Sequence, residues 1–228
     1  PSFRGVTGMS LLLEARGITK VFTSGGFAQQ QRTVAVDRVT LNLSSDTGSI
    51  VALAGESGSG KTTLGRILLG LETPTEGEVL YRGNNLTKLG RQDRKTFRRE
   101  VQAIFQDPFA VYNPFYKIDH VFNIAIGKYK LASSKDEARH LVEQAIRAVG
   151  LRPEETLGRY PHQLSGGQRQ RIIVARVFLL KPKIVIADEP VSMVDASLRA
   201  TILEALRELH RTQNMSILYI THDLNTAY

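Results

Sequence analysis

The chain has 228 residues, of which 42% are hydrophobic, and it carries a formal net charge of +8 at pH 7 with no cysteine. This length and apolar content suffice for a globular protein with a substantial core, as one domain or as a domain with a small insertion. The lack of cysteine excludes disulfide bonds and cysteine-ligated metals within the chain. No apolar run approaches the roughly 18–20 residues needed to cross a bilayer, so a membrane role would require a partner.

The excess of positive charge is compatible with a polyanionic partner such as nucleic acid. The densest basic stretch runs from Arg91 to Arg99, but Asp93 interrupts it and Glu100 follows it. No aromatic platform lies beside this stretch, so a solvated helical face explains it better than a nucleic-acid site does.

Residues 1–8 precede Met9 and are interpreted as a remnant of cloning. Two segments of alternating hydrophobicity follow, Leu13–Val21 and Val34–Leu43, and they predict antiparallel strands joined by a flexible loop. Phe22 follows the first segment and precedes the loop. An exposed aromatic ring there could stack on a nucleotide base, although spacing alone favours a place in the core.

The segment 49–63 combines a short apolar run, a glycine-rich loop and the start of a helix. Ile50–Ala54 is too short and too β-branched to favour a helix, and its unbroken apolarity predicts a central parallel strand covered on both faces. The loop matches G-x-x-x-x-G-K-[ST] between a strand and a helix, which is the context that this phosphate-binding motif requires.

Each residue type in this loop suits the binding of a nucleotide. Its glycines let backbone N–H groups turn inward with no Cβ in the way of an anion. Lys61 would bring a positive charge to the β- and γ-phosphates, and Thr62 would offer its hydroxyl to Mg²⁺ at a helix N-terminus. The predicted binding residues are Gly55, Ser57, Gly58, Ser59, Gly60, Lys61, Thr62 and Thr63.

The rest of the chain alternates strands with helices, which predicts right-handed crossovers and a largely parallel sheet. Between residues 107 and 161 the pattern is helical. Its clearest helix spans Lys135–Val149, with Ser134 and Glu137 as a capping box and Gly150 at the C-terminal end. We therefore expect a helical subdomain inserted into a core of residues 9–106 and 162–228. The other expected elements are helices at Thr63–Leu71, Ile172–Leu180 and Leu198–His210, and strands at Glu78–Tyr81, Gln102–Gln106, Ile184–Ala187 and Ile217–Ile220.

Three apolar strands end in polar groups: the Gly55 loop, Asp188-Glu189, and Thr221-His222-Asp223. Because ligands of open α/β sheets bind at the carboxyl ends of the strands, we expect these ends to converge. Asp188 is placed to hold Mg²⁺, directly or through water, opposite Thr62. Glu189 is placed to act as a general base toward an attacking water, or to position that water. Without the glycine-rich loop, the Asp-Glu-Pro sequence would be read as a turn or a helix cap.

The pentapeptide Leu164-Ser165-Gly166-Gly167-Gln168 resembles the signature sequence of the ATP-binding cassette (ABC) ATPases. A serine hydroxyl and glycine N–H groups at a helix start would form a second anion site. The resemblance implies an α/β P-loop NTPase fold of the ABC type, with a mainly parallel core sheet, an N-terminal antiparallel part and a helical insertion. It also implies a head-to-tail dimer, in which the signature of one subunit closes over ATP held by the loop of the other.

The resemblance covers Leu13 to Tyr228 and implies further roles. Gln106 resembles the Q-loop glutamine, Val191–Asp195 the D-loop and His222 the switch histidine, while Phe22 stands where the family has its adenine-stacking aromatic. The implied catalytic residues are Glu189, His222 and Gln106, and the implied cofactors are ATP and Mg²⁺. Mg²⁺ would be held by Thr62, Gln106 and Asp188, and the added nucleotide contacts would be Phe22, Ser165, Gly166, Gly167, Gln168 and Asp195.

Within the family, the stretches 105–108, 113–114, 160–171 and 192–197 look most like the ATPase subunits of dipeptide and oligopeptide importers, and nickel importers share much of the pattern. This implies permease subunits, an identical or related second ATPase subunit and, indirectly, a solute-binding protein, at the cytoplasmic face of the membrane and without nucleic acid. Residues 110–114 depart from the usual small-Ser-Leu-Asn-Pro, so the transported solute stays open. Family members continue beyond the switch histidine, which predicts a truncated chain with weak activity.

Two other hypotheses about the function remain open. The positive charge allows an ABC ATPase that acts on nucleic acid in DNA repair or on the ribosome, but the chain contains no long coiled coil, zinc insertion or second cassette. A catalytically inactive regulatory module is the other, and the intact Lys61, Asp188 and Glu189 argue against it.

Overall fold

The computed structural model describes residues 11–24, 31–44, 48–107, 112–192, 194 and 196–223, without the side chains of 196–198. The two alternating N-terminal segments form long antiparallel strands, β1 (Leu11–Ser24) and β2 (Gln31–Ser44), as predicted. The other edge of β1 pairs with β4 (Glu76–Tyr81), which turns back through Arg82-Gly83 into β5 (Asn84–Asn85). The result is a four-stranded antiparallel sheet in the order β2-β1-β4-β5.

A second four-stranded sheet has the order β3-β8-β7-β6 and is parallel throughout. Its strands are β3 (Ile50–Ala54), β6 (Val101–Ile104), β7 (Ile184–Asp188) and β8 (Ser216–Thr221). Every residue of β7 and β8 is buried, as expected for apolar strands between two layers. The predicted fold, a parallel core sheet with an N-terminal antiparallel part, is confirmed.

The prediction for β3 was wrong in its position. Among the described residues β3 pairs only with β8, so it lies at the edge of the sheet. Val51 and Leu53 pack against the hydrophobic cluster on one face, whereas Ile50, Ala52 and Ala54 on the other face are exposed. An unbroken apolar run indicates that a strand contains no charged residues, but it does not reveal whether one or two other strands pair with it.

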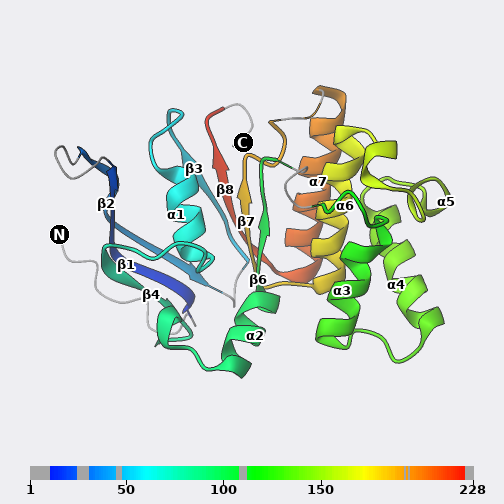
Figure 1. Ribbon diagram of the computed structural model, residues 1–228, viewed down its shortest axis with the longest axis horizontal. Coiled ribbons are helices and arrows are strands. Elements are labelled where there is room, and N and C mark those ends of the chain that lie inside the picture. Colours follow the sequence, from blue (N-terminus) through cyan, green and yellow to red (C-terminus); the bar gives the residue numbers. More distant parts are fainter. Residues whose placement is uncertain are drawn as a thin grey trace.

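The parallel sheet lies between two hydrophobic clusters, because side chains alternate across a strand. Ile184 and Ile186 of β7 point into a cluster with α1 (Lys61–Leu68) and the antiparallel sheet. Val185 and Ala187 point into the other cluster, with α6 (Gly166–Leu180) and α7 (Ala196–Gln213). Figure 1 shows this layering, with α1 on one side of the sheet and α6 and α7 on the other. Full burial of an isoleucine or valine side chain stabilises the fold by about 1.5–3 kcal/mol.

Of the remaining helices, α2 (Arg91–Glu100) lies below the parallel sheet near β6, and the others lie at the end of the molecule beyond α6 (Figure 1). The basic stretch forms α2, in which Phe97 is the buried residue, so the prediction of a solvated helical face is confirmed. Helices α3 (Asp119–Tyr129), α4 (Lys135–Ala148) and α5 (Pro153–Thr156) follow, with short 3₁₀ turns at Leu86–Lys88 and Pro161–Gln163. Within the described part of the chain, no helix combines the length and the apolarity that crossing a bilayer requires.

Two details of these helices correct the expectations. Ser134 caps α4 by accepting a hydrogen bond from the Glu137 N–H, but the Glu137 carboxylate accepts from the backbone N–H of Ser133 instead of closing the box on Ser134. Helix α6 starts at Gly166 and not at Ile172, because Ser165 provides its cap. Helices α3 and α4 share one cluster with α6 and the sheet, and the subdomain boundaries stay a prediction. The interpreted cloning remnant lies outside the described residues.

Candidate nucleotide-binding site

The carboxyl ends of three neighbouring parallel strands meet at one edge of the sheet. The pairing of Ala54 with Thr221 and of Asp188 with Ile220 brings the ends of β3, β8 and β7 into line, as predicted. A cavity of about 340 Å³ opens there. Its lining combines residues of the glycine-rich loop with residues from the other strand ends: Ala35, Ser57, Gly58, Gly60, Lys61, Thr62, Thr63, Gln106, Glu189 and His222.

The glycine-rich loop takes a conformation that only glycine adopts readily. Gly58 has φ +81° and Gly60 has φ +86°, both in the left-handed region. A Cβ on Gly60 would lie 1.8 Å from the carbonyl oxygen of Ala35 in β2, so the antiparallel sheet rests directly on the loop. Gly60 is also the N-cap of α1 and provides no side-chain cap, which leaves the helix N-terminus suited to an anion.

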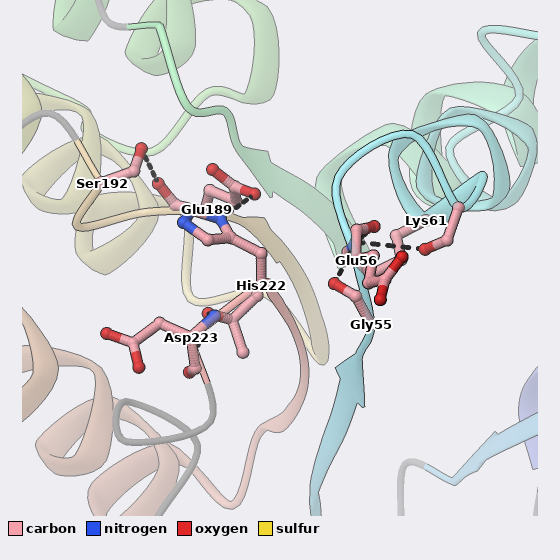
Figure 2. A network of polar contacts seen from close by, with 9 residues as sticks. Gly55, Glu56, Lys61, Glu189, Ser192, His222 and Asp223 are labelled. Atoms are coloured by element: carbon pink, nitrogen blue, oxygen red, sulfur yellow. Dashed lines mark hydrogen bonds and ion pairs between the residues drawn. The ribbon is translucent and has the colours of Figure 1, made fainter.

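Lys61 carries a buried positive charge into this loop. Its side chain is 8% exposed, and its Nζ donates hydrogen bonds to the carbonyl oxygens of Gly55 (2.7 Å) and Glu56 (2.6 Å) and to Ser59 Oγ (3.2 Å). Figure 2 shows the ammonium group curled back onto its own loop. All three acceptors are uncharged, so the charge of Lys61 is available to an anionic ligand.

Asp188 ends β7 as a buried carboxylate. Its Oδ1 atom is buried and has no hydrogen-bond partner among the described residues. Desolvation raises the pKa of Asp188, a hydrogen bond from Thr62 opposes this rise, and the charge of Glu189 adds to it. An unpartnered carboxylate oxygen beside a threonine hydroxyl is the kind of donor set that Mg²⁺ takes. Asp188 does not line the cavity itself, but it contacts Thr62, which lines the cavity together with Gln106, so these three residues fit the ion.

Glu189 and His222 form a contact between two strand ends. Glu189 Oε1 lies 2.6 Å from His222 Nδ1, with the carboxylate largely buried and the imidazole about half exposed (Figure 2). The backbone of Glu189 has φ +47°, an unfavourable conformation for a residue with a Cβ. Hydrogen bonds hold it there: its N–H donates to Ile220 O, and its carbonyl accepts from the N–H and the hydroxyl of Ser192.

Several predicted site residues lie outside this cavity. Phe22 ends β1 with its ring 42% exposed and the Lys20 ammonium 5.0 Å from the ring centroid, but it does not line the cavity. The signature residues lie at the start of α6, where Ser165 Oγ accepts from the Gln168 N–H and Gln168 Oε1 accepts from the Ser165 N–H. Gly166 and Gly167 open that helix. Asp195 lies outside the described residues.

Ala35 is a cavity residue that the sequence does not reveal. It contacts the loop through its backbone carbonyl, which every residue type carries, and its strand shows only the usual alternation. The buried Gln170 and Tyr112 escape notice for the same reason, because each donates to a backbone carbonyl far away in the chain.

This fold and this site define a P-loop nucleotide-binding protein. Residues 38–192 match the model of the ABC transporter family. The oligopeptide transport ATP-binding protein AppF of Bacillus subtilis is 39% identical over 220 residues, covering 95% of this chain and 66% of AppF. The dipeptide transport ATP-binding protein DppF of Escherichia coli is 40% identical over 218 residues, covering 95% of this chain and 64% of DppF.

The nickel import ATP-binding protein NikE of Escherichia coli is 38% identical, covering 93% of this chain and 78% of NikE. Among solved structures, MJ0796, a bacterial ABC transporter cassette in a dimeric structure, superimposes with a TM-score of 0.82 at 30% identity, covering 95% of this chain and 90% of that one. The chain therefore belongs to the ABC transporter family, and its fold is that of an ABC ATPase cassette. It spans about two thirds of the length of AppF and DppF.

Proposed function

We propose that this chain binds ATP with Mg²⁺ and hydrolyses it to drive solute import by an ABC transporter. The observation that carries the proposal is the convergence, in one cavity, of the Lys61 loop with Gln106, Glu189 and His222. Within the described chain, a cation whose hydrogen-bond acceptors are all uncharged and a buried carboxylate oxygen without a hydrogen-bond partner are what a Mg-nucleotide would complete.

Each residue then has a separate task. The N–H groups of the loop and the Lys61 ammonium hold the phosphates, and Thr62, Gln106 and Asp188 hold Mg²⁺, which neutralises phosphate charge when bound. Glu189 accepts the proton of the water that attacks the γ-phosphorus. His222 donates through Nδ1 to Glu189 and so keeps that carboxylate oriented toward the cavity. Phe22 stacks on the adenine ring from the edge of the site.

The second part of the proposal is a head-to-tail dimer. Ser165 and its glycine neighbours do not line the Lys61 cavity of their own chain, so they are available to the nucleotide of a second copy or of a related subunit. MJ0796, the similar cassette, was solved as a dimer, including a post-hydrolysis state bound to ADP and Pi. ATP binding would close this dimer and hydrolysis would reopen it.

The solute is proposed to be a dipeptide or an oligopeptide, because AppF and DppF carry these names, with nickel as the alternative that NikE represents. Permease subunits would dock on the helical side, where Phe115 (86% exposed), Tyr116 and Ile124 present apolar surface to solvent. A solute-binding protein would act through them, and the chain would lie at the cytoplasmic face of the membrane.

The activity is tested with purified chain by measuring ATP binding and phosphate release with Mg²⁺ and with EDTA. We expect Mg²⁺-dependent hydrolysis, and Lys61→Ala should abolish ATP binding while Lys95→Ala on α2 should leave it unchanged. Wild-type chain that binds no ATP, or equal binding by Lys61→Ala, would refute the proposal.

The dimer is tested by crosslinking, for which the absence of native cysteine is an advantage. Ser57→Cys and Ser165→Cys variants, both carrying Glu189→Gln, are mixed with ATP and a short bifunctional thiol reagent. The head-to-tail arrangement predicts crosslinked dimers in the mixture and not in either variant alone. Equal yields with and without ATP would count against it.

A further inference from the structure

Gln170 is a buried amide on α6 that bridges two chain segments beside the cavity. Its residue exposure is 2%, and its Nε2 donates to the carbonyl oxygens of Pro190 (2.9 Å) and Phe105 (3.3 Å). These acceptors belong to the segments that leave β7 and β6. One nitrogen therefore joins three elements of the structure: α6, the exit of β7 and the exit of β6.

The chemistry of this contact explains why an amide occupies the position. A primary amide has two N–H bonds on one uncharged nitrogen, so it satisfies two carbonyl acceptors without burying a charge. The opposite amide orientation would place an oxygen against both carbonyls, so the donors must face them. Gln170 Oε1 is buried with no hydrogen-bond partner among the described residues, which costs stability. The two hydrogen bonds that the amide nitrogen donates therefore explain why glutamine occupies this position.

The two acceptors adjoin the residues of the proposed reaction. Phe105 directly precedes Gln106, and Pro190 directly follows Glu189. Glu189 is held in its left-handed conformation by hydrogen bonds with Ile220 and Ser192, and the bond to Pro190 extends that support by one residue.

A second link joins α6 to the chain beyond Gln106. The Tyr112 hydroxyl donates to the carbonyl oxygen of Arg169 at 2.7 Å, and burial raises the pKa of Tyr112, so the phenol stays protonated and keeps donating at neutral and moderately alkaline pH. Arg169 and Gln170 are adjacent, and both belong to the helix that Ser165 caps.

We infer that Gln170 is a positioning residue that fixes the backbone of Gln106 and of Glu189 relative to α6. The inference rests on the proposed ATPase function for its consequence in catalysis. A shift of α6, the helix that begins with the signature residues, would pull both segments through one side chain. The general base and the Q-loop glutamine would then move together.

The test compares Gln170→Met, which keeps the length and removes both donors, with Gln170→Glu and with Gln144→Glu on the exposed face of α4 as the control. We expect Gln170→Met to lower turnover about tenfold or more, as the loss of bonds that hold a reacting geometry does, with little change in ATP affinity. Gln144→Glu should match the wild type in both.

Gln170→Glu provides a pH-dependent version of the same change. An ionised carboxylate has no donor for the two carbonyls, whereas a protonated one has a single donor. Burial raises the pKa of a carboxyl group, so the defect of Gln170→Glu should shrink as the pH falls from 8 to 6. The defect of Gln170→Met should not change in that range. A purely structural loss would affect both variants alike at every pH.

Hydrogen exchange supplies a readout that does not need activity. Peptides covering 105–107 and 189–192 should exchange faster in either Gln170 variant, while peptides of α4 and β1 keep wild-type rates. If wild-type chain fails to hydrolyse ATP, the proposed function fails and exchange alone decides the role of Gln170. The inference is overturned if exchange in both segments is unchanged. Wild-type turnover by Gln170→Met would also overturn the inference. If the methionine variant does not fold, wild-type turnover by Gln170→Glu at pH 8 would overturn it instead.

Discussion

His222 Nδ1 lies 2.6 Å from Glu189 Oε1, although the two residues stand 33 positions apart at the ends of different strands. A carboxylate accepts hydrogen bonds, so His222 Nδ1 is the donor in this contact. The contact fixes the rotamer of a carboxylate whose backbone is already constrained at φ +47°. The carboxylate of Glu189 is therefore held in one orientation.

The first prediction concerns the base itself. Glu189→Gln keeps the shape of the side chain but removes the proton acceptor, so turnover should fall about 10²- to 10⁴-fold while Mg-ATP still binds. Because hydrolysis would no longer reopen the dimer, size-exclusion chromatography with ATP should show more dimer than in the wild type. Glu204→Gln, an exposed change on α7, is the control, and full turnover by Glu189→Gln would exclude the assigned role.

The second prediction tests whether His222 acts through Glu189. His222→Ala should lower turnover with ATP affinity nearly unchanged. If the histidine only orients the carboxylate, its removal should cost little once the carboxylate is gone. The double variant with Glu189→Gln should then be about as slow as Glu189→Gln alone, as measured in single-turnover assays. Independent, additive losses would show that His222 has a role of its own.

A third prediction separates two glycines of the same loop. Gly60→Ala places a Cβ against the Ala35 carbonyl oxygen, so the loop or β2 must shift, and both stability and ATP binding should drop. Gly58→Ala meets no atom within 4 Å and should cost only the strain of its positive φ, about 1–2 kcal/mol. Urea denaturation of the two variants gives the comparison. Equal stability of the two variants would contradict the close approach.

The fourth prediction follows from the raised pKa of Asp188. The folded state holds this proton more tightly than the unfolded state does, so stability falls as the pH rises from the unfolded pKa of about 3.9 through the folded pKa. Without nucleotide, Asp188→Asn should therefore raise the melting temperature by a few degrees at pH 7, and the gain should vanish near pH 3.5. With Mg-ATP bound, Asp188→Asn should have a lower melting temperature than the wild type. A variant less stable than the wild type at pH 7 without ligand would contradict this sign.

The fifth prediction concerns Phe22, whose ring is 42% exposed and carries little of the core. Stacking of a base on an aromatic ring contributes about 1–3 kcal/mol, so Phe22→Ala should weaken ATP binding roughly 5- to 150-fold. Phe22→Tyr keeps an aromatic ring and should bind ATP with wild-type affinity. GTP should lose affinity similarly, because stacking does not read the base edges. Phe115→Ala removes a more exposed phenylalanine ring elsewhere on the surface and should leave binding unchanged in a fluorescence titration.

Much of the fold could be predicted from the sequence because its signals are local. The glycine-rich loop, the alternating strands β1 and β2, and the cap of α4 each depend on residues close together in the chain. The rule that ligands bind at the carboxyl ends of parallel strands also predicts that Glu189 and His222 lie at the same edge of the sheet.

The rest depended on contacts that residue types do not encode. The edge position of β3 depends on which strands pair with it, and Ile50 shows the same apolar character whether it is covered or exposed. The carbonyl of Ala35 approaches Gly60 of the glycine-rich loop, and the amide of Gln170 donates to the carbonyl of Pro190. Both contacts join distant segments through the backbone, so neither the alternation of β2 nor the signature sequence reveals them. The direct contact of Glu189 with His222 required the observed rotamers.

The alternation of β7 between two hydrophobic clusters limits how this protein can vary. Ile184 and Ile186 pack into one hydrophobic cluster, and Val185 and Ala187 pack into the other. Swapping one aliphatic residue for another disturbs a single interior, whereas deleting or inserting one residue would exchange the occupants of both at once and displace Asp188 from its place beside Thr62. The length of this strand is therefore constrained more tightly than its composition, and natural insertions and deletions should be confined to the loops around it.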